Sequence, residues 1–354
     1  MVMPIIKSRV PFAETFIPPS IADREIVKHL IQAHLAPLTR GDIQPVGLHV
    51  VGGLGTGKTV TIKVILENLN IPYVYINLNS LAKAKAYHAI AQILQKLGGT
   101  PYGSLTRLEN IVKKMLSGKA FVIVLDEADA CPRKELDHLL HFLTRETTVT
   151  VILISRKPEL IQELAPDTQD SFKYRECLFE EYTQQELLEI LKQRSKLALF
   201  STAYTKEILK EIAKEAEKIG SARYAIDLLA EAASLAEYYQ TEKITKKHVQ
   251  EALERVRKTF FETLIAVLPK THKAVLQCLF NAEQKNIPLS VTALFECVKR
   301  TLEKNKLGPI TKRQFERILQ SLKERNLIFI KKVGLGRGRG FRVYVHLADY
   351  LMLT

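Results

Sequence analysis

The sequence predicts an α/β domain built on a parallel sheet, followed by a helical domain and a small C-terminal domain with the outline of a winged helix. Three observations predict this fold class. Apolar runs alternate with helical patterns early in the chain, only helical patterns follow Tyr182, and residues 269–354 combine three helical segments with two β-rich ones. Strands that are apolar throughout and alternate with helices indicate a parallel sheet covered on both faces. We place the domains at residues 1–178, 179–262 and 263–354.

Four apolar runs are expected to form the sheet. They span residues 46–51, 73–78, 121–125 and 149–154, and an amphipathic helix around residues 26–35 precedes the first of them. In open parallel sheets, ligands bind at the carboxyl ends of the strands. The residues that follow these runs are therefore the candidates for a functional site.

A glycine-rich turn follows the first run. Residues 52–59 read Gly-Gly-Leu-Gly-Thr-Gly-Lys-Thr and satisfy the pattern G-x-x-x-x-G-K-[ST] between a strand and a helix. Backbone N–H groups in such a loop point at phosphate oxygens, and the following helix adds its positive end. Lys58 supplies a charge to the β and γ phosphates, and the Thr59 hydroxyl can coordinate Mg²⁺. We expect ATP or ADP with Mg²⁺, held by Gly52, Gly53, Leu54, Gly55, Thr56, Gly57, Lys58, Thr59 and Val60.

Two acidic residues follow the run at 121–125 in an arrangement of the Walker B type. Asp126 would bind Mg²⁺, mostly through water, and Glu127 would polarise the attacking water. Residues 126–129 also spell the tetrad that names one class of helicases. Those enzymes need a second RecA-like domain, which the helical segments after Tyr182 do not supply, so that class is rejected.

The helical segments after Tyr182 are expected to form a lid over the sheet domain. They span residues 184–199, 205–219, 222–238 and 245–260, with breaks marked by Gly220 and Thr241.

Positive charge is concentrated at the C-terminal end. From Arg255 to Thr354 there are 20 Lys+Arg and 7 Asp+Glu, a net charge of +13, whereas the preceding residues carry 32 basic and 31 acidic side chains, a net charge of +1. This asymmetry is expected of a nucleic-acid-binding domain appended to a neutral one. The same excess could also serve solubility or an acidic protein partner, so the charge alone does not decide. Together with the winged-helix outline, it predicts double-stranded DNA as a partner.

The C-terminal segment supplies the residues for that role. Residues 311–322 place Phe315, Ile318, Leu319 and Leu322 on one helical stripe. The other faces near the start of this helix are polar, and the first residues of a recognition helix usually read base edges. A glycine- and arginine-rich tip at 334–340 is narrow enough to enter a minor groove. The predicted DNA-binding residues are Lys312, Arg313, Gln314, Arg317, Arg337, Arg339 and Arg342.

Composition excludes several other classes of protein. The chain is 46% hydrophobic and 25% charged, as in globular proteins, and no apolar stretch is long enough to span a bilayer. Its first residues do not have the pattern of a signal peptide. The cysteines at 131, 177, 278 and 297 form no CxxC pair, so neither a zinc ribbon nor a disulfide framework is expected. We expect a cytoplasmic protein with no membrane partner.

Together these motifs resemble the archaeal initiator family that is related to the eukaryotic origin recognition complex and its helicase-loading partner. Members are AAA+ ATPases with a C-terminal winged helix, and the resemblance covers nearly the whole chain. It also rests on Phe16-Ile17-Pro18-Pro19 with Arg24-Glu25, on residues 38–41, on the lid entry at 180–187, and on residues 220–229, which resemble a sensor 2 motif. The resemblance implies that Arg223 reaches the nucleotide phosphates from the lid.

The resemblance further implies a DNA replication initiator that binds duplex origin DNA through its winged helix and its AAA+ domain. Such a protein helps to recruit the replicative helicase, has paralogous initiators as further partners, and is associated with the nucleoid. In the AAA+ domain, the resemblance assigns secondary DNA contacts to the start of an inserted helix, with Lys83, Lys85, Tyr87 and His88.

Two departures from the family pattern predict slow hydrolysis. The family usually ends its sensor 1 strand with Ile-Ser-Asn, whereas this chain has Ile154-Ser155-Arg156, so Ser155 is expected to hold the water or Arg156 to contact phosphate. The expected arginine finger falls near Asp167, and loss of such a finger costs several powers of ten in rate. We therefore expect a nucleotide-bound switch with weak ATPase activity.

Two other classes combine similar parts. A clamp-loader-like AAA+ remodeller is expected to have an intact arginine finger and no basic wing. A signalling ATPase of the STAND type also combines a P-loop, a helical lid and a winged helix, but it usually carries further sensor or repeat domains.

Overall fold

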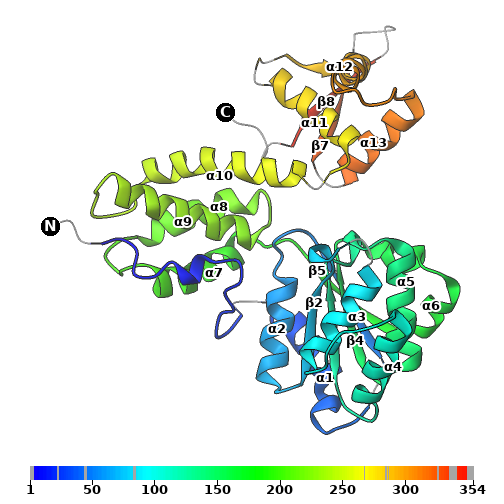
Figure 1. The fold of residues 1–354 in the computed structure, drawn as a ribbon. Helices are drawn as coiled ribbons and strands as arrows, with labels where there is room; N and C mark the ends of the chain where they lie inside the picture. The colour runs from blue at the N-terminus through cyan, green and yellow to red at the C-terminus, as the bar shows by residue number, and fades with distance from the viewer. Residues whose placement is uncertain are drawn as a thin grey trace. The chain divides into compact units, whose positions relative to one another are not determined.

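The computed structural model of the chain describes residues 4–21, 24–43, 46–82, 85–266, 268–283, 285, 287–324, 327–334 and 341–348. The chain divides into two compact units, Met1–Ala230 and Glu231–Thr354. Figure 1 labels the main helices and strands of both. Within the described ranges, no helix combines the length and the apolar character needed to cross a membrane.

In its described residues, the first unit contains a five-stranded sheet of order β2-β3-β4-β1-β5 in which all neighbours are parallel. The strands are β1 (Gly47–Gly52), β2 (Tyr73–Asn77), β3 (Val122–Asp126), β4 (Thr150–Ser155) and β5 (Tyr174–Phe179). The four predicted strands are confirmed. The edge strand β5 was not predicted, because most of its side chains are exposed or half-buried, which leaves no apolar run.

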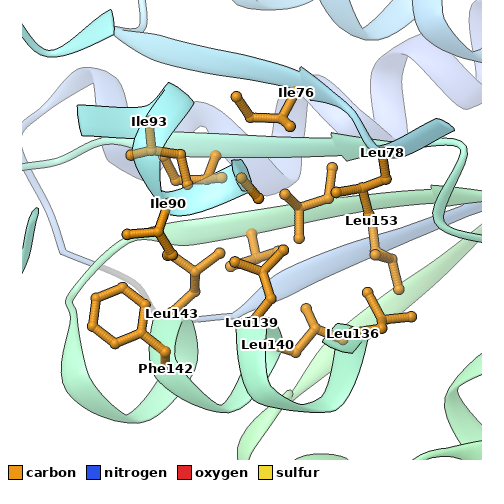
Figure 2. Close-up of a cluster of buried hydrophobic side chains, with 14 of the residues drawn as sticks. Ile76, Leu78, Ile90, Ile93, Leu136, Leu139, Leu140, Phe142, Leu143 and Leu153 are labelled. Atoms are coloured by element: carbon orange, nitrogen blue, oxygen red, sulfur yellow. The ribbon is translucent and has the colours of Figure 1, made fainter. Parts of the chain in front are cut away.

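Helices cover both faces of the sheet, because each strand directs alternate side chains to opposite sides. On β3, Ile123 and Leu125 pack with α3 (Lys85–Lys96), α4 (Leu105–Leu116) and α5 (Arg133–His141). Figure 2 shows part of this core, including Ile90 of α3 and Leu139 of α5. Val122 and Val124 on the same strand pack with α1 (Glu25–Thr39) and α2 (Lys58–Asn68). The shorter elements are η1 (Val10–Phe12), η2 (Leu78–Ser80), η3 (Ala128–Ala130), η4 (Phe142–Glu146), η5 (Pro158–Glu163) and α6 (Pro166–Ser171).

The predicted lid helices are all confirmed as α7 (Gln184–Ala198), α8 (Lys206–Glu217), α9 (Ala222–Tyr238) and α10 (Lys246–Ala266). Helix α7 starts at a capping box, in which the Thr183 hydroxyl accepts from the Glu186 backbone N–H and the Glu186 carboxylate accepts from Thr183 N. The N-terminal segment runs along the end of this helix, since the N–H groups of Lys7 and Ser8 both donate to the Ala198 carbonyl. The predicted boundary at residue 178 stays a prediction.

The second unit contains a winged helix, as predicted. Its described elements are α11 (Lys270–Glu283), β6 (Leu289–Ser290), α12 (Val291–Lys304), α13 (Lys312–Glu324), β7 (Ile328–Gly334) and β8 (Phe341–Leu347). The strands form an antiparallel sheet of order β6-β8-β7, and the helices enclose a separate core that includes Val275, Val298 and Leu322. Strand β6 was not predicted, because two residues give no periodicity.

Candidate functional site

The loop after β1 requires glycine at two positions. Gly55 and Gly57 have φ values of +74° and +84°, in the left-handed region that L side chains rarely adopt. A Cβ at Gly57 would lie 2.4 Å from the Tyr182 hydroxyl, and a Cβ at Gly55 would lie 2.0 Å from the Ser221 Oγ. Tyr182 and Ser221 belong to the lid side of the unit, so the glycines let the loop approach it closely.

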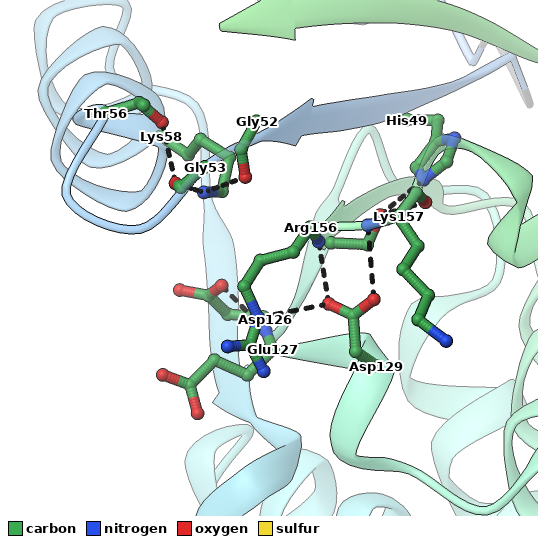
Figure 3. A network of polar contacts seen from close by, with 11 residues as sticks. His49, Gly52, Gly53, Thr56, Lys58, Asp126, Glu127, Asp129, Arg156 and Lys157 are labelled. Atoms are coloured by element: carbon green, nitrogen blue, oxygen red, sulfur yellow. Dashed lines mark hydrogen bonds and ion pairs between the residues drawn. The ribbon is translucent and has the colours of Figure 1, made fainter. Parts of the chain in front are cut away.

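Lys58, the first residue of α2, folds back over this loop (Figure 3). Its ammonium Nζ donates to the carbonyl oxygens of Gly52 at 2.8 Å and Gly53 at 2.6 Å. Burial lowers the pKa of Lys58 to about 8, and the nearby Asp126 carboxylate opposes that shift. The ammonium of this half-buried lysine has only two neutral acceptors. An anion would stabilise its charge further, so Lys58 suits a phosphate group.

Thr59 and Asp126 form the oxygen-rich part of the site. Thr59 Oγ1 donates to Asp126 Oδ2 at 2.5 Å, and the Tyr75 hydroxyl donates to the same oxygen at 2.9 Å. The other carboxylate oxygen accepts from the Glu127 backbone N–H at 2.7 Å. A hydroxyl beside a carboxylate is the hard oxygen donor set that Mg²⁺ takes, so these two residues fit the predicted metal role.

Glu127 is the first residue beyond β3 and has a left-handed backbone, with φ of 52°. This turn leaves the Asp126 side chain buried and the Glu127 side chain exposed. The two neighbouring carboxylates therefore meet different environments. The buried one is positioned by donors, and the exposed one is open to water, as a water-polarising role requires.

At the end of β4, Ser155 already has two partners within the protein, although it is one of the residues expected to hold the attacking water. The Ser155 hydroxyl is buried and donates to the Lys157 carbonyl at 2.9 Å. Because the hydroxyl hydrogen of Ser155 is donated to Lys157, the Ser155 oxygen accepts a hydrogen bond from His49 Nε2, which lies 2.8 Å away. Burial lowers the pKa of His49 to about 4, so its ring is neutral. Both partners of Ser155 lie within the protein, so it could hold a water only through its remaining lone pair or after exchanging a partner.

Arg156 extends from the end of β4 toward Asp126 and Glu127 (Figure 3). Asp129 orients this turn, because its carboxylate accepts from the backbone N–H groups of Arg156 at 2.7 Å and Lys157 at 3.2 Å. The Arg156 side chain is 45% exposed, and its positive charge helps to lower the pKa of Lys58. Arg156, at the predicted sensor 1 position, is thus close enough for its charge to act on the P-loop lysine.

Helix α9 begins directly against the P-loop, where Ala222 N donates to the Gly55 carbonyl at 3.0 Å. This places the predicted sensor 2 residue Arg223 beside the loop. Its guanidinium is paired with the Glu14 carboxylate and lies 3.9 Å from Asp227 Oδ2. Burial raises the pKa of Asp227 to about 6, against the effect of Arg223. Two carboxylates therefore hold the side chain that is expected to reach phosphate.

Arg24 and Tyr182 join the N-terminal segment to the entry of the lid. The Arg24 guanidinium lies 4.1 Å from the centroid of the Tyr182 ring and donates to the Glu180 carbonyl. Because the Tyr182 hydroxyl also lies against Gly57, this stacked pair forms one wall beside the P-loop.

The described DNA-binding candidates are exposed. They are Lys312, Arg313, Gln314 and Arg317 on the first turns of α13 and Arg342 on β8. The predicted stripe of Phe315, Ile318, Leu319 and Leu322 is buried, which confirms the orientation of the helix. Arg337 and Arg339 lie outside the described residues.

Gln314 has a further role at the start of α13. Its side-chain oxygen accepts from the backbone N–H of Thr311 at 2.9 Å and from the Thr311 hydroxyl at 3.0 Å. The Thr311 hydroxyl in turn accepts from Gln314 N at 3.3 Å, which completes a capping box. Part of the Gln314 amide is therefore engaged in starting the helix.

Lys85, one of the secondary candidates for DNA contact, has partners within its own domain. Its half-buried ammonium donates to the carbonyl oxygens of Leu78 at 2.9 Å and Ala130 at 2.8 Å, so its charge is used inside the domain. The half-buried Tyr87 donates through its hydroxyl to the Gly103 carbonyl at 3.3 Å, and Lys83 lies outside the described residues.

A parallel sheet carrying a P-loop and an acidic pair at its carboxyl ends, followed by a helical lid, defines a protein of the AAA+ ATPase class. Residues 47–164 match the model of the AAA domain family, and residues 188–254 match that of the Cdc6 AAA+ ATPase-type lid domain. The ORC1-type DNA replication protein of Methanosphaera stadtmanae is 30% identical over 345 residues, covering 92% of this chain and 88% of that protein. The chain belongs to the family of ORC1-type DNA replication proteins.

Two further comparisons agree with this family. ORC1-type DNA replication protein 1 of Sulfurisphaera tokodaii is 28% identical over 351 residues, covering 94% of this chain and 88% of that protein. The solved structure of the Aeropyrum pernix ORC1 protein in complex with DNA superposes with a TM-score of 0.72 at 25% identity and covers 97% of this chain and 94% of that one.

Proposed function

We propose that this protein binds ATP and ADP and acts as a DNA replication initiator whose nucleotide state works as a switch. The observation that carries this proposal is the convergence of Lys58, Thr59, Asp126 and Glu127 at one P-loop, with the sensor 2 helix starting against the same loop. Membership of the ORC1-type family supports the initiator role over clamp loading or STAND-type signalling.

The chain's own residues divide the work at this site. Backbone N–H groups of residues 53–59 and the Lys58 ammonium would hold the phosphates. Thr59 and Asp126 would hold Mg²⁺, which, when bound, supplies positive charge to the phosphate oxygens. Glu127 would accept a proton from the attacking water, and Arg223 would exchange a carboxylate partner for a phosphate oxygen.

We propose that hydrolysis is slow. Arg156 stands where the family pattern has an asparagine, and it cannot accept a hydrogen bond from a water molecule. Asp167, where an arginine finger is expected, is an exposed residue on α6. Arg223 is held by Glu14 and Asp227, so its engagement with nucleotide competes with an existing ion pair.

We propose that duplex DNA binds to α13 and to the wing, by which we mean β7, β8 and the glycine- and arginine-rich segment 334–340 between them. The exposed cations at the start of α13 and Arg342 on β8 support this, as does the net charge of the C-terminal region. The Aeropyrum pernix relative, at 25% identity, is a protein solved with DNA. Contacts from the AAA+ domain belong to the same proposal, with His88 a remaining candidate from the helix start.

The test is selection of fragments from sheared genomic DNA by the purified full-length protein with ADP and Mg²⁺. We expect one or a few discrete segments to be enriched many-fold, and enrichment of all fragments in proportion to their abundance would contradict an origin-binding role. We further propose that the DNA-bound protein, together with paralogous initiators, recruits the replicative helicase at the nucleoid. Capture of the purified helicase on such a segment only in the presence of this protein tests that step.

A further inference from the structure

Two cysteine thiols meet between the first two helices of the winged helix. Cys278 on α11 is buried, Cys297 on α12 is half-buried, and their sulfur atoms lie 2.6 Å apart. Non-bonded carbon atoms, which are smaller than sulfur, rest roughly 3.5–4.0 Å apart, whereas a disulfide bond measures about 2.0 Å. The two sulfurs are therefore already at a separation that a covalent bond would shorten only slightly.

Rigid packing holds this arrangement. Cys278 belongs to the core of the winged helix, and Cys297 packs against that core from the neighbouring helix. Thr301, one turn after Cys297, donates to the Cys297 carbonyl at 3.0 Å, and its hydroxyl lies 3.3 Å from the Cys278 sulfur. The pairing is a property of two packed helices rather than of a loop.

Solvent reaches only one side of the pair. Cys297 lines an open groove of about 920 Å³ along α12, together with Arg300, Lys304 and Arg342. Cys278 faces the core, where burial and the hydrogen bond from Cys297 raise the pKa of its thiol to about 12. A small polar oxidant that enters the groove therefore meets Cys297 first.

We propose that Cys278 and Cys297 form a reversible disulfide that links α11 to α12, with Cys297 as the sulfur that reacts with peroxide.

In the first step the Cys297 sulfur attacks hydrogen peroxide, an S–O bond forms, the O–O bond breaks, and the departing hydroxide takes the thiol proton to give water. In the second step the Cys278 sulfur displaces the hydroxyl group of the Cys297 sulfenic acid. The S–S bond forms, the S–O bond breaks, and the Cys278 proton leaves in a second water molecule. Two electrons pass from the two thiols to the peroxide, and a dithiol reductant reverses the oxidation.

The bond would change the stability of the winged helix. It would close a segment of 20 residues, from 278 to 297, and so restrict the unfolded chain. For a domain of this size we expect the melting temperature of the winged helix to rise by roughly 10 °C on oxidation.

The full-length protein is treated with hydrogen peroxide at a micromolar concentration that exceeds the protein concentration. The reaction is quenched, the protein is denatured, and its free thiols are titrated. We expect titratable thiols to fall from four to two, with the intact mass lower by two hydrogen atoms and with a linked peptide pair containing Cys278 and Cys297. Dithiothreitol should restore all four thiols. Four remaining thiols, or loss of thiols without the linked peptides, would overturn the proposal.

Single variants separate the two roles. Cys278→Ser should leave Cys297 trapped as a sulfenic acid that reacts with dimedone, whereas Cys297→Ser should protect Cys278 from the same dose. The buried Cys131 and Cys177, changed singly to Ala, serve as controls and should leave the linked pair unchanged. A linked pair formed equally fast by denatured protein would also count against the proposal, since the native packing would then contribute nothing.

Discussion

The Thr59 hydroxyl donates a 2.5 Å hydrogen bond to Asp126 Oδ2 and so joins the start of α2 to the end of β3. These residues are far apart in the sequence, yet the fold brings together the two side chains that suit Mg²⁺. Tyr75 donates to the same carboxylate oxygen at 2.9 Å from the neighbouring strand β2. The carboxylate is thus oriented before any ligand binds.

Thr59→Ala is expected to weaken the effect of Mg²⁺ on nucleotide binding. Mg²⁺ should raise the ADP affinity of the wild type, and removal of a metal ligand should make that increase smaller by a factor of roughly 10–100. The ADP affinity measured in EDTA should change little. Calorimetry with Mg²⁺ and with EDTA measures the difference. Tyr75→Phe is the matched control, because it removes the other donor to Asp126 and keeps both proposed metal ligands. An equal loss in both variants would argue against a metal role for Thr59.

Lys58→Ala should abolish tight ADP or ATP binding, because it removes the half-buried ammonium beside the loop. In the free protein the pKa of Lys58 is about 8, so the ammonium is charged below that pH and becomes neutral above it. Phosphate favours the charged form, so affinity should fall as the pH rises above about 8, with proton uptake on binding. Calorimetry in buffers of different ionisation enthalpy detects that uptake. Lys58→Arg, which does not titrate there, should show none, and unchanged affinity in Lys58→Ala would refute the site.

Glu127→Gln should keep nucleotide binding and stop the remaining hydrolysis. The exposed carboxylate is the proposed proton acceptor, and an amide cannot replace it, so the rate should fall by roughly 10²–10⁴-fold. Phosphate release under single-turnover conditions measures the rate. The wild type itself should turn over below about 1 s⁻¹, near the low end of ordinary enzyme rates. Faster turnover by the wild type would favour a motor over a switch.

Glu14→Gln should strengthen nucleotide binding by freeing Arg223. The Glu14 and Arg223 side chains are 66% and 42% exposed, so their pairing is weak, and its loss should raise affinity by no more than about fivefold. Titration with a fluorescent ADP analogue measures the change. In an Arg223→Ala background the same substitution should have no effect. A gain that persists there would mean that Glu14 acts on the site by another route.

Arg313→Ala should reduce discrimination between the target duplex and random duplex by roughly 1–3 kcal/mol. Lys323→Ala, which removes an exposed charge from the last turn of the same helix, is the matched control and should preserve that ratio. Fluorescence anisotropy with both duplexes gives the comparison. Equal losses on the two duplexes in Arg313→Ala would assign this residue to phosphate rather than to bases.

A separate prediction concerns Arg337 and Arg339 in the glycine- and arginine-rich segment 334–340. Replacing Arg337 and Arg339 with Ala should weaken binding to all duplexes, and the slope of log affinity against log salt should flatten by about one unit for each lost phosphate contact. Titration at several salt concentrations measures this slope. Unchanged affinity and slope would remove these two arginines from the DNA interface.

Features that are contiguous in the sequence were predictable. The P-loop and the acidic pair each occupy one short segment beside a buried strand, so residue type and position sufficed. The edge strand β5 has mixed exposure, so its burial is decided by tertiary neighbours that the local pattern does not show. Helix α4 was also not predicted, although Leu108, Val112 and Leu116 recur at helical spacing, a signal that the sequence contains.

Contacts between distant segments were not predictable. His49 is a polar residue in an otherwise apolar strand, which was a signal, but its partner Ser155 comes from β4. Glu14 meets Arg223 only because the N-terminal segment runs along the lid. Gln314 was assigned to base contacts, although the spacing from Thr311 also fits a capping box, which the structure contains.

We propose that this chain marks the sites where replication starts. Crosslinking of the protein to its own chromosome, mapped genome-wide in growing cells, tests it most directly. We expect one or a few sharp peaks that coincide with the regions of highest marker frequency, where replication begins. Even coverage of the chromosome, or peaks that lie apart from those regions, would contradict it.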